Sequence, residues 1–247
     1  MKLSIIVPCY NEEKAIPNLI SQLEPAVKEL KKNYAVELVF VDDGSADRTY
    51  ELLQQKYGKR KDAKIVRHRK NYNLGGALRS GFKFSTGDVI IPLDCDCTFP
   101  PSKISELVSL LDERTDIVNA SPYHPLGRLD NVPLYRRFLS KSVIHIYRFL
   151  MGKKQIYTYT VMVRAYRRKV IENVKFKSND FLASSELLVY ALLRGYKVKD
   201  YPTTLYTRQY GESSIKLARV IASHMGFILK LIEIKLFGMP KEQKNHK

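Results

Sequence analysis

The chain has 247 residues, of which 42 are Lys or Arg and 25 are Asp or Glu, giving a formal net charge of +17 at pH 7. Hydrophobic residues make up 45% and charged residues 27%, the values of an ordinary soluble globular protein. The positive excess indicates an anionic partner, such as nucleic acid, a phosphorylated small molecule or acidic lipid. Three cysteines, and first residues that lack the pattern of a signal peptide, argue against a disulfide framework and favour a reducing, cytoplasmic location.

Strands and helices alternate in the predicted order of elements. Apolar runs predict strands at 3–7, 36–41, 64–67 and 88–93, and the start of another at 117. Apolar residues at helical spacing predict helices at 12–30, 47–57, 73–84 and from 100 onward. Because short links join these elements, we expect βαβ units and a mostly parallel sheet with helices on both faces. After about residue 120 the alternation weakens, and the pattern predicts helices at 134–151 and 184–194 and extended segments at 161–166 and 197–202.

Asp94 and Asp96 follow the apolar run 89–93 and are separated by one residue. Residues i and i+2 of an extended chain point to the same side, so both carboxylates should reach the carboxyl edge of the sheet together. Two like charges at one place are costly unless a cation lies between them. The pair therefore predicts a divalent metal site that holds a phosphorylated ligand, and the alternative is a solvated turn after the strand.

Polar residues also follow the first two predicted strands, at 8–12 and 42–45. The three strand ends share one edge of a parallel sheet and can converge on one ligand. Just before the fourth strand, Gly75 and Gly76 could let the backbone approach that ligand closely. Arg79 could match the oxygens of a diphosphate.

Four segments together resemble the family 2 glycosyltransferases of GT-A fold: 4–12, 41–47, 73–77 and 94–96. The resemblance covers roughly residues 3–215. Within this family the chain most resembles the polyprenyl-phosphate enzymes of the dolichyl-phosphate mannose synthase type. Residues 100–101, 164–168 and 208–213 are similar to the sequence pattern of that subgroup. The resemblance implies an α/β, Rossmann-like GT-A domain at 1–215. Residues 216–247 are expected to form a C-terminal amphipathic helix with a basic tail.

The resemblance also implies roles for single residues. Asp96, together with Asp94, should hold Mg²⁺ or Mn²⁺ on the diphosphate of a GDP- or UDP-sugar, and Arg208 should assist on the same phosphates. The metal would neutralise charge on the leaving nucleoside diphosphate. The residues expected to bind the nucleotide-sugar are Pro8, Tyr10, Asn11, Glu12, Asp43, Gly75, Gly76, Arg79 and Asp94.

The implied acceptor is a polyprenyl phosphate, with inversion at the anomeric carbon. The residues expected to bind it are Arg128, Arg136, Arg137, Ser140 and Ser213. An ionised phosphate needs no strong base, whereas a saccharide or glycolipid hydroxyl would need one, and the candidates are Glu186, with Asp180 behind it. Alternatively, the paired arginines line a solvated helix face, and Glu186 is an acid stabilised at a helix N-terminus.

Three departures from the subgroup pattern leave the sugar open. Cys95 stands where Ala is usual, Thr98 stands near a usual Gln, and residues 160–163 replace the usual Thr-Ser-Gly-Phe before Arg164. The last segment is expected near the sugar or the acceptor. A relative that binds nucleotide without transferring sugar is a further alternative.

The C-terminal segment from Leu217 is strongly apolar but contains charged residues, among them Arg219, Lys230 and Glu233. Those charges make a bilayer span costly. We expect an amphipathic helix lying on the membrane surface, peripheral at its inner face, with a basic tail that includes Lys241. The alternative is a helix packed on the domain core or on another subunit.

Nucleic acid is the competing explanation for the positive charge. The basic residues do not form one patch interleaved with aromatic stacking motifs, and the acidic strand ends would repel phosphate without a metal. The sequence therefore predicts no nucleic-acid partner. It leaves the oligomeric state open.

Overall fold

The computed structural model describes residues 1–153, 155–208, 210 and 217–238. Its strands are β1 (Lys2–Cys9), β2 (Ala35–Asp42), β3 (Ala63–Arg67), β4 (Val89–Pro92), β5 (Ile117–Ser121), β6 (Arg128–Leu129), β7 (Arg164–Arg167), β8 (Val198–Pro202) and β9 (Thr204–Leu205). Its helices are α1 (Ile16–Leu30), α2 (Thr49–Tyr57), α3 (Asn73–Phe84), the 3₁₀ turn η1 (Pro101–Lys103), α4 (Ile104–Ser109), α5 (Leu134–Met151), α6 (Arg168–Asn173), α7 (Leu182–Leu193) and α8 (Leu217–Phe237).

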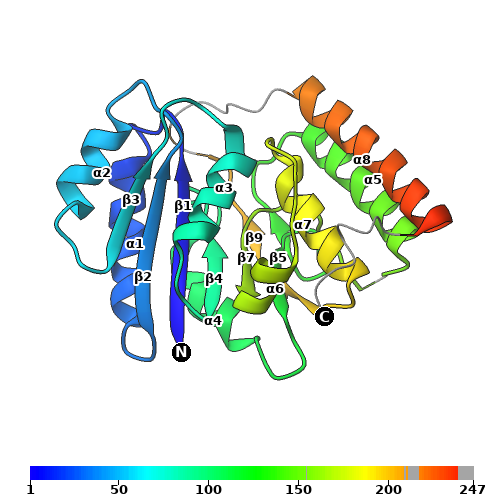
Figure 1. Ribbon diagram of the computed structural model, residues 1–247, viewed down its shortest axis with the longest axis horizontal. Coiled ribbons are helices and arrows are strands. Elements are labelled where there is room, and N and C mark those ends of the chain that lie inside the picture. The colour runs from blue at the N-terminus through cyan, green and yellow to red at the C-terminus, as the bar shows by residue number, and fades with distance from the viewer. Residues whose placement is uncertain (154, 209, 211–216, 239–247) are drawn as a thin grey trace.

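A seven-stranded sheet in the order β3-β2-β1-β4-β7-β5-β8 forms the centre of the fold (Figure 1). β1 pairs in parallel with β2 and β4, β2 with β3, and β5 with β8. Only β7 runs antiparallel among these strands, between β4 and β5. The predicted mostly parallel α/β sheet is confirmed.

Two apolar cores lie on opposite faces of this sheet. Successive residues of a strand point to opposite faces, so Ile5 joins one core and Ile6 the other. The core that contains Ile5 is completed by α1, α2 and α4, and the core that contains Ile6 by α3, α5, α7 and α8. Helices therefore cover both faces, as the long apolar runs of the strands predict.

α1 and β7 begin three or more residues later than the sequence pattern predicts. α1 starts at Ile16 rather than at residue 12, because residues 12–15 form a turn in which Ala15 N donates to Glu12 O at 2.8 Å. Pro17 suits the first turn of the helix that follows, where no backbone donor is needed. The predicted strand 161–166 is shortened at its start, and only Arg164–Arg167 pairs with neighbours.

α8 lies alongside α5 at one side of the molecule and also packs against α7 (Figure 1). Its inner face, which includes His224, Phe227 and Leu231, is buried in the core on that side of the sheet. The alternative that this helix packs on the domain core is therefore confirmed for that face. Within the residues that the structure describes, none of the helices has the length and apolar character needed to span a bilayer.

Candidate functional site

The loops after β1 and β2 are joined at the carboxyl edge of the sheet. Asn11 has a left-handed backbone (φ 53°), its N–H donates to Ser45 Oγ at 3.0 Å, and its Oδ1 accepts from Ala46 N at 2.9 Å. Glu12 N donates to Thr49 Oγ1 at 2.7 Å. The predicted nucleotide residues Pro8 and Tyr10 are half-buried beside this junction. Asn11 thus has a structural function here, and the junction fixes the position of Glu12.

Asp94 and Asp96 follow β4 on the same edge. They are half-buried, as is Thr98, whereas the intervening Cys95 and Cys97 are buried. The Thr98 N–H donates to Asp96 Oδ1 at 3.1 Å, and its hydroxyl oxygen lies 3.5 Å from Asp94 Oδ2. Thr98 therefore contacts both carboxylates. The sequence did not predict these contacts, because they depend on the geometry of the turn.

Arg208 brings a positive charge to these carboxylates from the segment after β9. Its guanidinium forms an ion pair with Glu12, and its Nε lies 3.8 Å from Asp96 Oδ2. Nε also donates to the backbone oxygen of Tyr210 at 2.6 Å. The sequence predicted Glu12, Asp96 and Arg208 as separate site residues, and the structure brings them together.

Two of the carboxylates at this edge, those of Glu12 and Asp94, hold protons more tightly than usual. Burial raises the pKa of Glu12 to about 7, with Arg208 opposing and Asp96 adding to the shift. Burial and the negative charge of Asp96 also raise the pKa of Asp94. Three carboxyl groups thus gather around one arginine, an arrangement that a further cation would stabilise.

The donor set fits a hard divalent cation. Carboxylate oxygens are the ligands that Mg²⁺ and Mn²⁺ prefer. Across the described residues, no three His, Cys, Asp or Glu side chains are grouped as a metal-binding set. The carboxylates of Asp94 and Asp96 would be a partial ligand set, of the kind that holds Mg²⁺ when substrate phosphates and water complete its coordination.

Asp43 lies after β2 and accepts hydrogen bonds from the chain itself. Its Oδ1 lies 2.6 Å from His68 Nδ1 and accepts from Tyr72 N at 2.9 Å, while His68 Nε2 lies 2.7 Å from Ser80 Oγ. Burial raises the pKa of Asp43, and the hydrogen bond with His68 opposes that shift. The sequence missed the pairing with His68, although His68 follows β3 at the same edge that Asp43 reaches.

Gly75 and Arg79 contact a neighbouring loop. Gly75 N donates to Asn179 O at 2.7 Å, and a Cβ on Gly75 would lie 2.1 Å from Ser178 O. Arg79 Nη1 donates to Ser178 O at 2.9 Å. A Cβ on Gly76 would meet Tyr72 Cβ at 2.4 Å. These close approaches involve other parts of the chain, and the role of these residues toward a diphosphate stays a prediction.

Glu186 bonds to the same loop, which contains Lys177 and Ser178. It is 2% exposed, and its Oε2 accepts from Lys177 N at 3.0 Å and from Ser178 N at 2.8 Å. It lies within α7 rather than in the first positions of that helix. Asp180 instead accepts from Leu182 N at 2.9 Å at the start of α7. No interaction recorded for the described residues joins Glu186 to the carboxylates of Asp94 and Asp96.

A buried arginine fixes the segment that leads into β7. Arg164 is fully buried and donates to Asn119 Oδ1 at 2.7 Å, to Ser184 O at 2.8 Å and to Tyr159 O at 2.7 Å. Ser185 Oγ also donates to Tyr159 O at 3.0 Å. Residues 160–163, the segment expected near the sugar or acceptor, therefore lie between two residues that are held in the core, Tyr159 and Arg164.

The predicted acceptor residues lie on β6 and α5. Arg128 and Arg136 are exposed, and Arg137 and Ser140 are half-buried. Burial raises the pKa of Tyr123, and Ser140 and Arg137 both oppose that shift, so these three side chains are neighbours. Ser213 lies outside the described residues.

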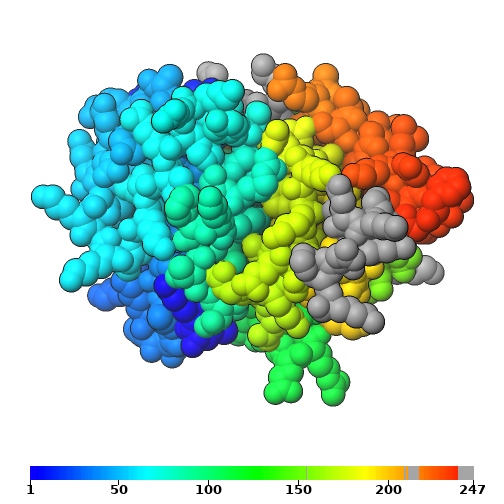
Figure 2. Space-filling view, in the orientation of Figure 1, coloured from blue at the N-terminus to red at the C-terminus, as the bar shows by residue number. Residues whose placement is uncertain are grey.

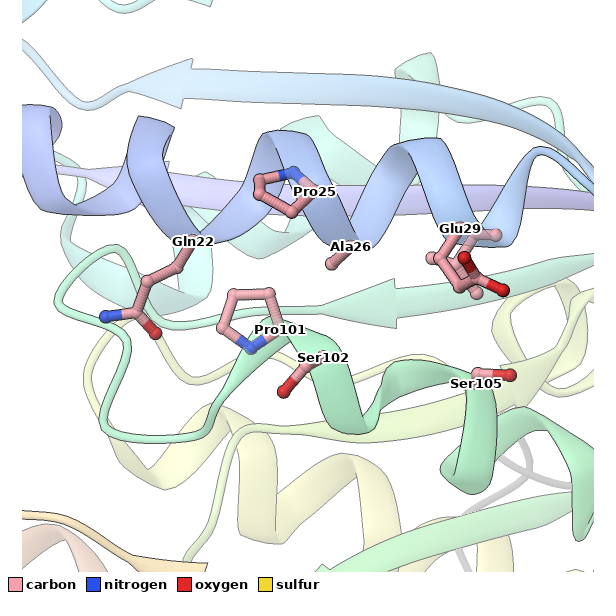
Figure 3. Close-up of a pocket in the computed structure, with 8 residues that line it drawn as sticks. Gln22, Pro25, Ala26, Glu29, Pro101, Ser102 and Ser105 are labelled. Carbon is pink, nitrogen blue, oxygen red and sulfur yellow. The ribbon is translucent and has the colours of Figure 1, made fainter.

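A cavity of about 170 Å³ lies between α1 and the turn η1 (Figure 3). Gln22, Pro25, Pro101 and Ser105 are among its lining residues. It contains none of the predicted site residues. The candidate site is therefore the open carboxyl edge of β1, β2 and β4 rather than this cavity.

Comparison with known proteins identifies a related family. The model for Glycosyl transferase family 2 matches residues 4–175. Over 234 residues the chain is 33% identical to the dolichol-phosphate mannosyltransferase of Pyrococcus furiosus. Over 222 residues it is 32% identical to the undecaprenyl-phosphate 4-deoxy-4-formamido-L-arabinose transferase of Salmonella choleraesuis. These matches cover 94% and 89% of this chain but 64% of each relative, so the chain spans under two thirds of their length.

A solved structure shares the fold at low sequence identity. Glucosyl-3-phosphoglycerate synthase from Mycobacterium tuberculosis, in complex with Mn²⁺, uridine diphosphate and phosphoglyceric acid, matches with a TM-score of 0.68. The match is 18% identical and covers 97% of this chain and 80% of the synthase. At that identity the likeness shows the fold alone.

Proposed function

Since the chain belongs to glycosyl transferase family 2, we propose that it is a metal-dependent, inverting enzyme that moves a sugar from a GDP- or UDP-sugar to a polyprenyl phosphate. The observation that carries this proposal is the meeting of Glu12, Asp96 and Arg208 beside Asp94 at the carboxyl edge of β1, β2 and β4. Ligands of open α/β sheets bind at this edge. The names of both curated relatives, which are polyprenyl-phosphate sugar transferases, support the acceptor class.

Asp94 and Asp96 would hold the divalent cation, and that cation would supply charge neutralisation for the departing diphosphate. Thr98 orients both carboxylates through its backbone N–H and its hydroxyl. Arg208 is already beside Asp96 and can donate hydrogen bonds to phosphate oxygens. Asp43 would border the nucleoside, held in place by His68 and Tyr72.

The bonding of Glu186 favours a phosphate acceptor over a hydroxyl acceptor. A hydroxyl must lose its proton to a base within hydrogen-bond reach, whereas a phosphate is already ionised. Glu186 was the candidate base, but it is buried and accepts two backbone hydrogen bonds from Lys177 and Ser178. A buried carboxylate that already accepts two backbone hydrogen bonds is poorly suited to take a proton from the substrate.

The outer surfaces of α5 and α8 support a location at a membrane surface. Phe149 on α5 is 83% exposed, and Leu229 on α8 is 65% exposed. The sequence of α5 contains four Lys or Arg residues and no acid. Figure 2 shows the side chains of α8 at one edge of the molecule. Apolar side chains interleaved with basic ones bind the interface of an anionic membrane, which would bring the site to a lipid acceptor.

The proposal is tested by supplying purified protein with Mn²⁺, a panel of UDP- and GDP-sugars, and a polyprenyl phosphate or the matching polyprenol. We expect glycolipid only from the phosphate, and its loss in the Asp94→Ala, Asp96→Ala double variant. Asp112→Ala, at an exposed carboxylate on the surface, is the matched control and should retain turnover. Full turnover in the double variant, or equal use of the polyprenol, would overturn the proposal.

A further inference from the structure

Two of the three cysteines meet directly beneath the candidate metal site. Cys9 is the last residue of β1, and Cys95 lies between Asp94 and Asp96. Their sulfur atoms are 3.5 Å apart, and the two residues are 2% and 4% exposed. All three cysteines are free thiols. This contact joins residues 86 positions apart in the sequence.

The strand register brings the ends of β1 and β4 side by side, and Cys95 lies in the turn that follows β4. Ile6 of β1 pairs with Pro92 of β4, and Leu93 N donates to Ile6 O at 2.8 Å. Cys9 and Cys95 each lie three positions beyond that pair. Neighbouring strands are about 4.8 Å apart, which is within the range of about 4.4–6.8 Å that disulfide-linked Cα atoms adopt. A bond between the two sulfur atoms therefore needs a local shift of little more than an ångström and no rearrangement of the sheet.

We propose that Cys9 and Cys95 are an oxidation site, at which a reversible disulfide forms and disables the adjacent carboxylate pair. In this step the two S–H bonds break and one S–S bond forms. The two electrons and two protons pass to a hydroperoxide, which is reduced to water and an alcohol, or to two waters if it is hydrogen peroxide. A thiol reductant reverses the step by exchange.

The bond must displace the metal-binding turn. The sulfur atoms have to approach from 3.5 Å to about 2.05 Å, a movement of more than an ångström. Cys95 is covalently joined to both Asp94 and Asp96, so their carboxylates move with it. Metal–ligand distances tolerate only about 0.2 Å. This consequence rests on the proposed function, because it requires that the carboxylate pair hold the metal.

Cys97 provides a matched control within the same turn. It is also buried, but its sulfur lies 4.0 Å from the backbone oxygen of Cys95 and has no recorded contact with the sulfur of Cys9. Oxidation should therefore spare Cys97. The three single variants, Cys9→Ala, Cys95→Ala and Cys97→Ala, separate pairing at this site from general thiol damage.

The test exposes folded protein to hydrogen peroxide, quenches it, and counts free thiols after unfolding, with peptide mapping of any disulfide. Wild type and Cys97→Ala should each lose two thiols as a Cys9–Cys95 link, whereas Cys9→Ala and Cys95→Ala should form no internal link. Mn²⁺-dependent turnover of the nucleotide-sugar should fall on the order of 10²-fold in the two linked proteins and return with dithiothreitol.

Each outcome decides a separate claim. Three remaining thiols in oxidised wild type, or a link that includes Cys97, would overturn the oxidation site. A Cys9–Cys95 link that leaves turnover unchanged would overturn its effect on the carboxylates. If the reduced protein transfers no sugar from any donor, the proposed function is wrong. The number of free thiols after oxidation still tests the oxidation site in that case.

Discussion

Arg208 forms an ion pair with Glu12 and thereby joins the segment after β9 to the loop after β1, residues 196 positions apart in the sequence. The pair is largely buried, and Asp96 Oδ2 lies 3.8 Å from Nε of the same guanidinium. A charge-assisted contact at this depth orients the arginine toward the edge where a diphosphate would lie.

Arg208→Ala should lower the turnover of the nucleotide-sugar by about 10²–10³-fold, because a preorganised donor facing a developing charge is removed. Steady-state kinetics on the lipid product measure the change. Arg48→Ala removes an exposed arginine whose side chain pairs with Glu51, and it should leave turnover within twofold. A similar loss in both variants would refute a specific role for Arg208.

Thr98→Val should raise the Mn²⁺ concentration needed for half-maximal activity by about 10–100-fold, the usual effect of removing a hydrogen bond behind a metal ligand. Valine keeps the backbone N–H that bonds Asp96 and removes only the hydroxyl near Asp94. Mn²⁺ titration of turnover measures the shift. Thr115→Val, whose hydroxyl bonds Asp112 on the surface, is the control and should titrate as wild type does.

Glu186→Gln should weaken the fold more than the chemistry. The charged acceptor of two backbone N–H groups is replaced by a neutral one, so the free energy of unfolding should fall by about 1–3 kcal/mol. Urea unfolding measures this loss, and kcat should change by less than about threefold. A fall of kcat by 10²-fold or more at unchanged donor binding would instead identify Glu186 as a base.

Phe149→Asp combined with Leu229→Asp should abolish co-sedimentation with vesicles that contain phosphatidylserine. Both side chains are exposed on the neighbouring helices α5 and α8, and each aspartate adds a charge that anionic lipid repels. Phe84→Asp changes an exposed aromatic residue on α3 and should bind vesicles normally. Unaltered binding of the double variant would exclude this surface as the docking face.

The free energy of unfolding should depend on pH through Glu37. Burial alone would raise its pKa, but hydrogen bonds from Lys2, Ser4 and Thr86 outweigh burial and lower it to about 2. The stabilisation is therefore complete above the ordinary pKa of 4.5 and is lost as the pH falls from there toward 2. Urea unfolding between pH 2 and 6 should show this decline in wild type and a flatter dependence in Glu37→Gln. Parallel curves would contradict the assignment.

Local patterns in the sequence predicted the sheet and the carboxylate pair well. The apolar runs identified β1, β2 and β4, and the polar residues after them identified the edge at which Asp94 and Asp96 lie. These features depend on neighbours within a few residues, because strand period and strand ends are local properties.

Contacts between distant segments were not predictable in the same way. The pairing of Asp43 with His68, and of Glu12 with Arg208, depends on which loops share an edge after folding. Gly75 was expected to let the backbone approach a ligand; glycine does not specify what approaches it, and the structure shows Ser178 close to it. Of the residues expected to contact the acceptor or membrane, Ser213 and Lys241 lie outside the described residues.

The antiparallel direction of β7 brings a further segment of the chain to the carboxyl edge of the parallel strands. Because β7 runs opposite to β4, it is the start of β7, at Arg164, that lies at the carboxyl edge of the parallel strands. Residues 157–163 therefore approach that edge from the other direction, and Tyr157, Thr158 and Tyr159 tie them to Asp200, Asn119 and Arg164. Substitutions there could alter the choice of acceptor or sugar while the loops of β1, β2 and β4 stay unchanged. A single reversed strand thus brings a segment from outside the loops of β1, β2 and β4 to the edge at which we propose that the donor binds.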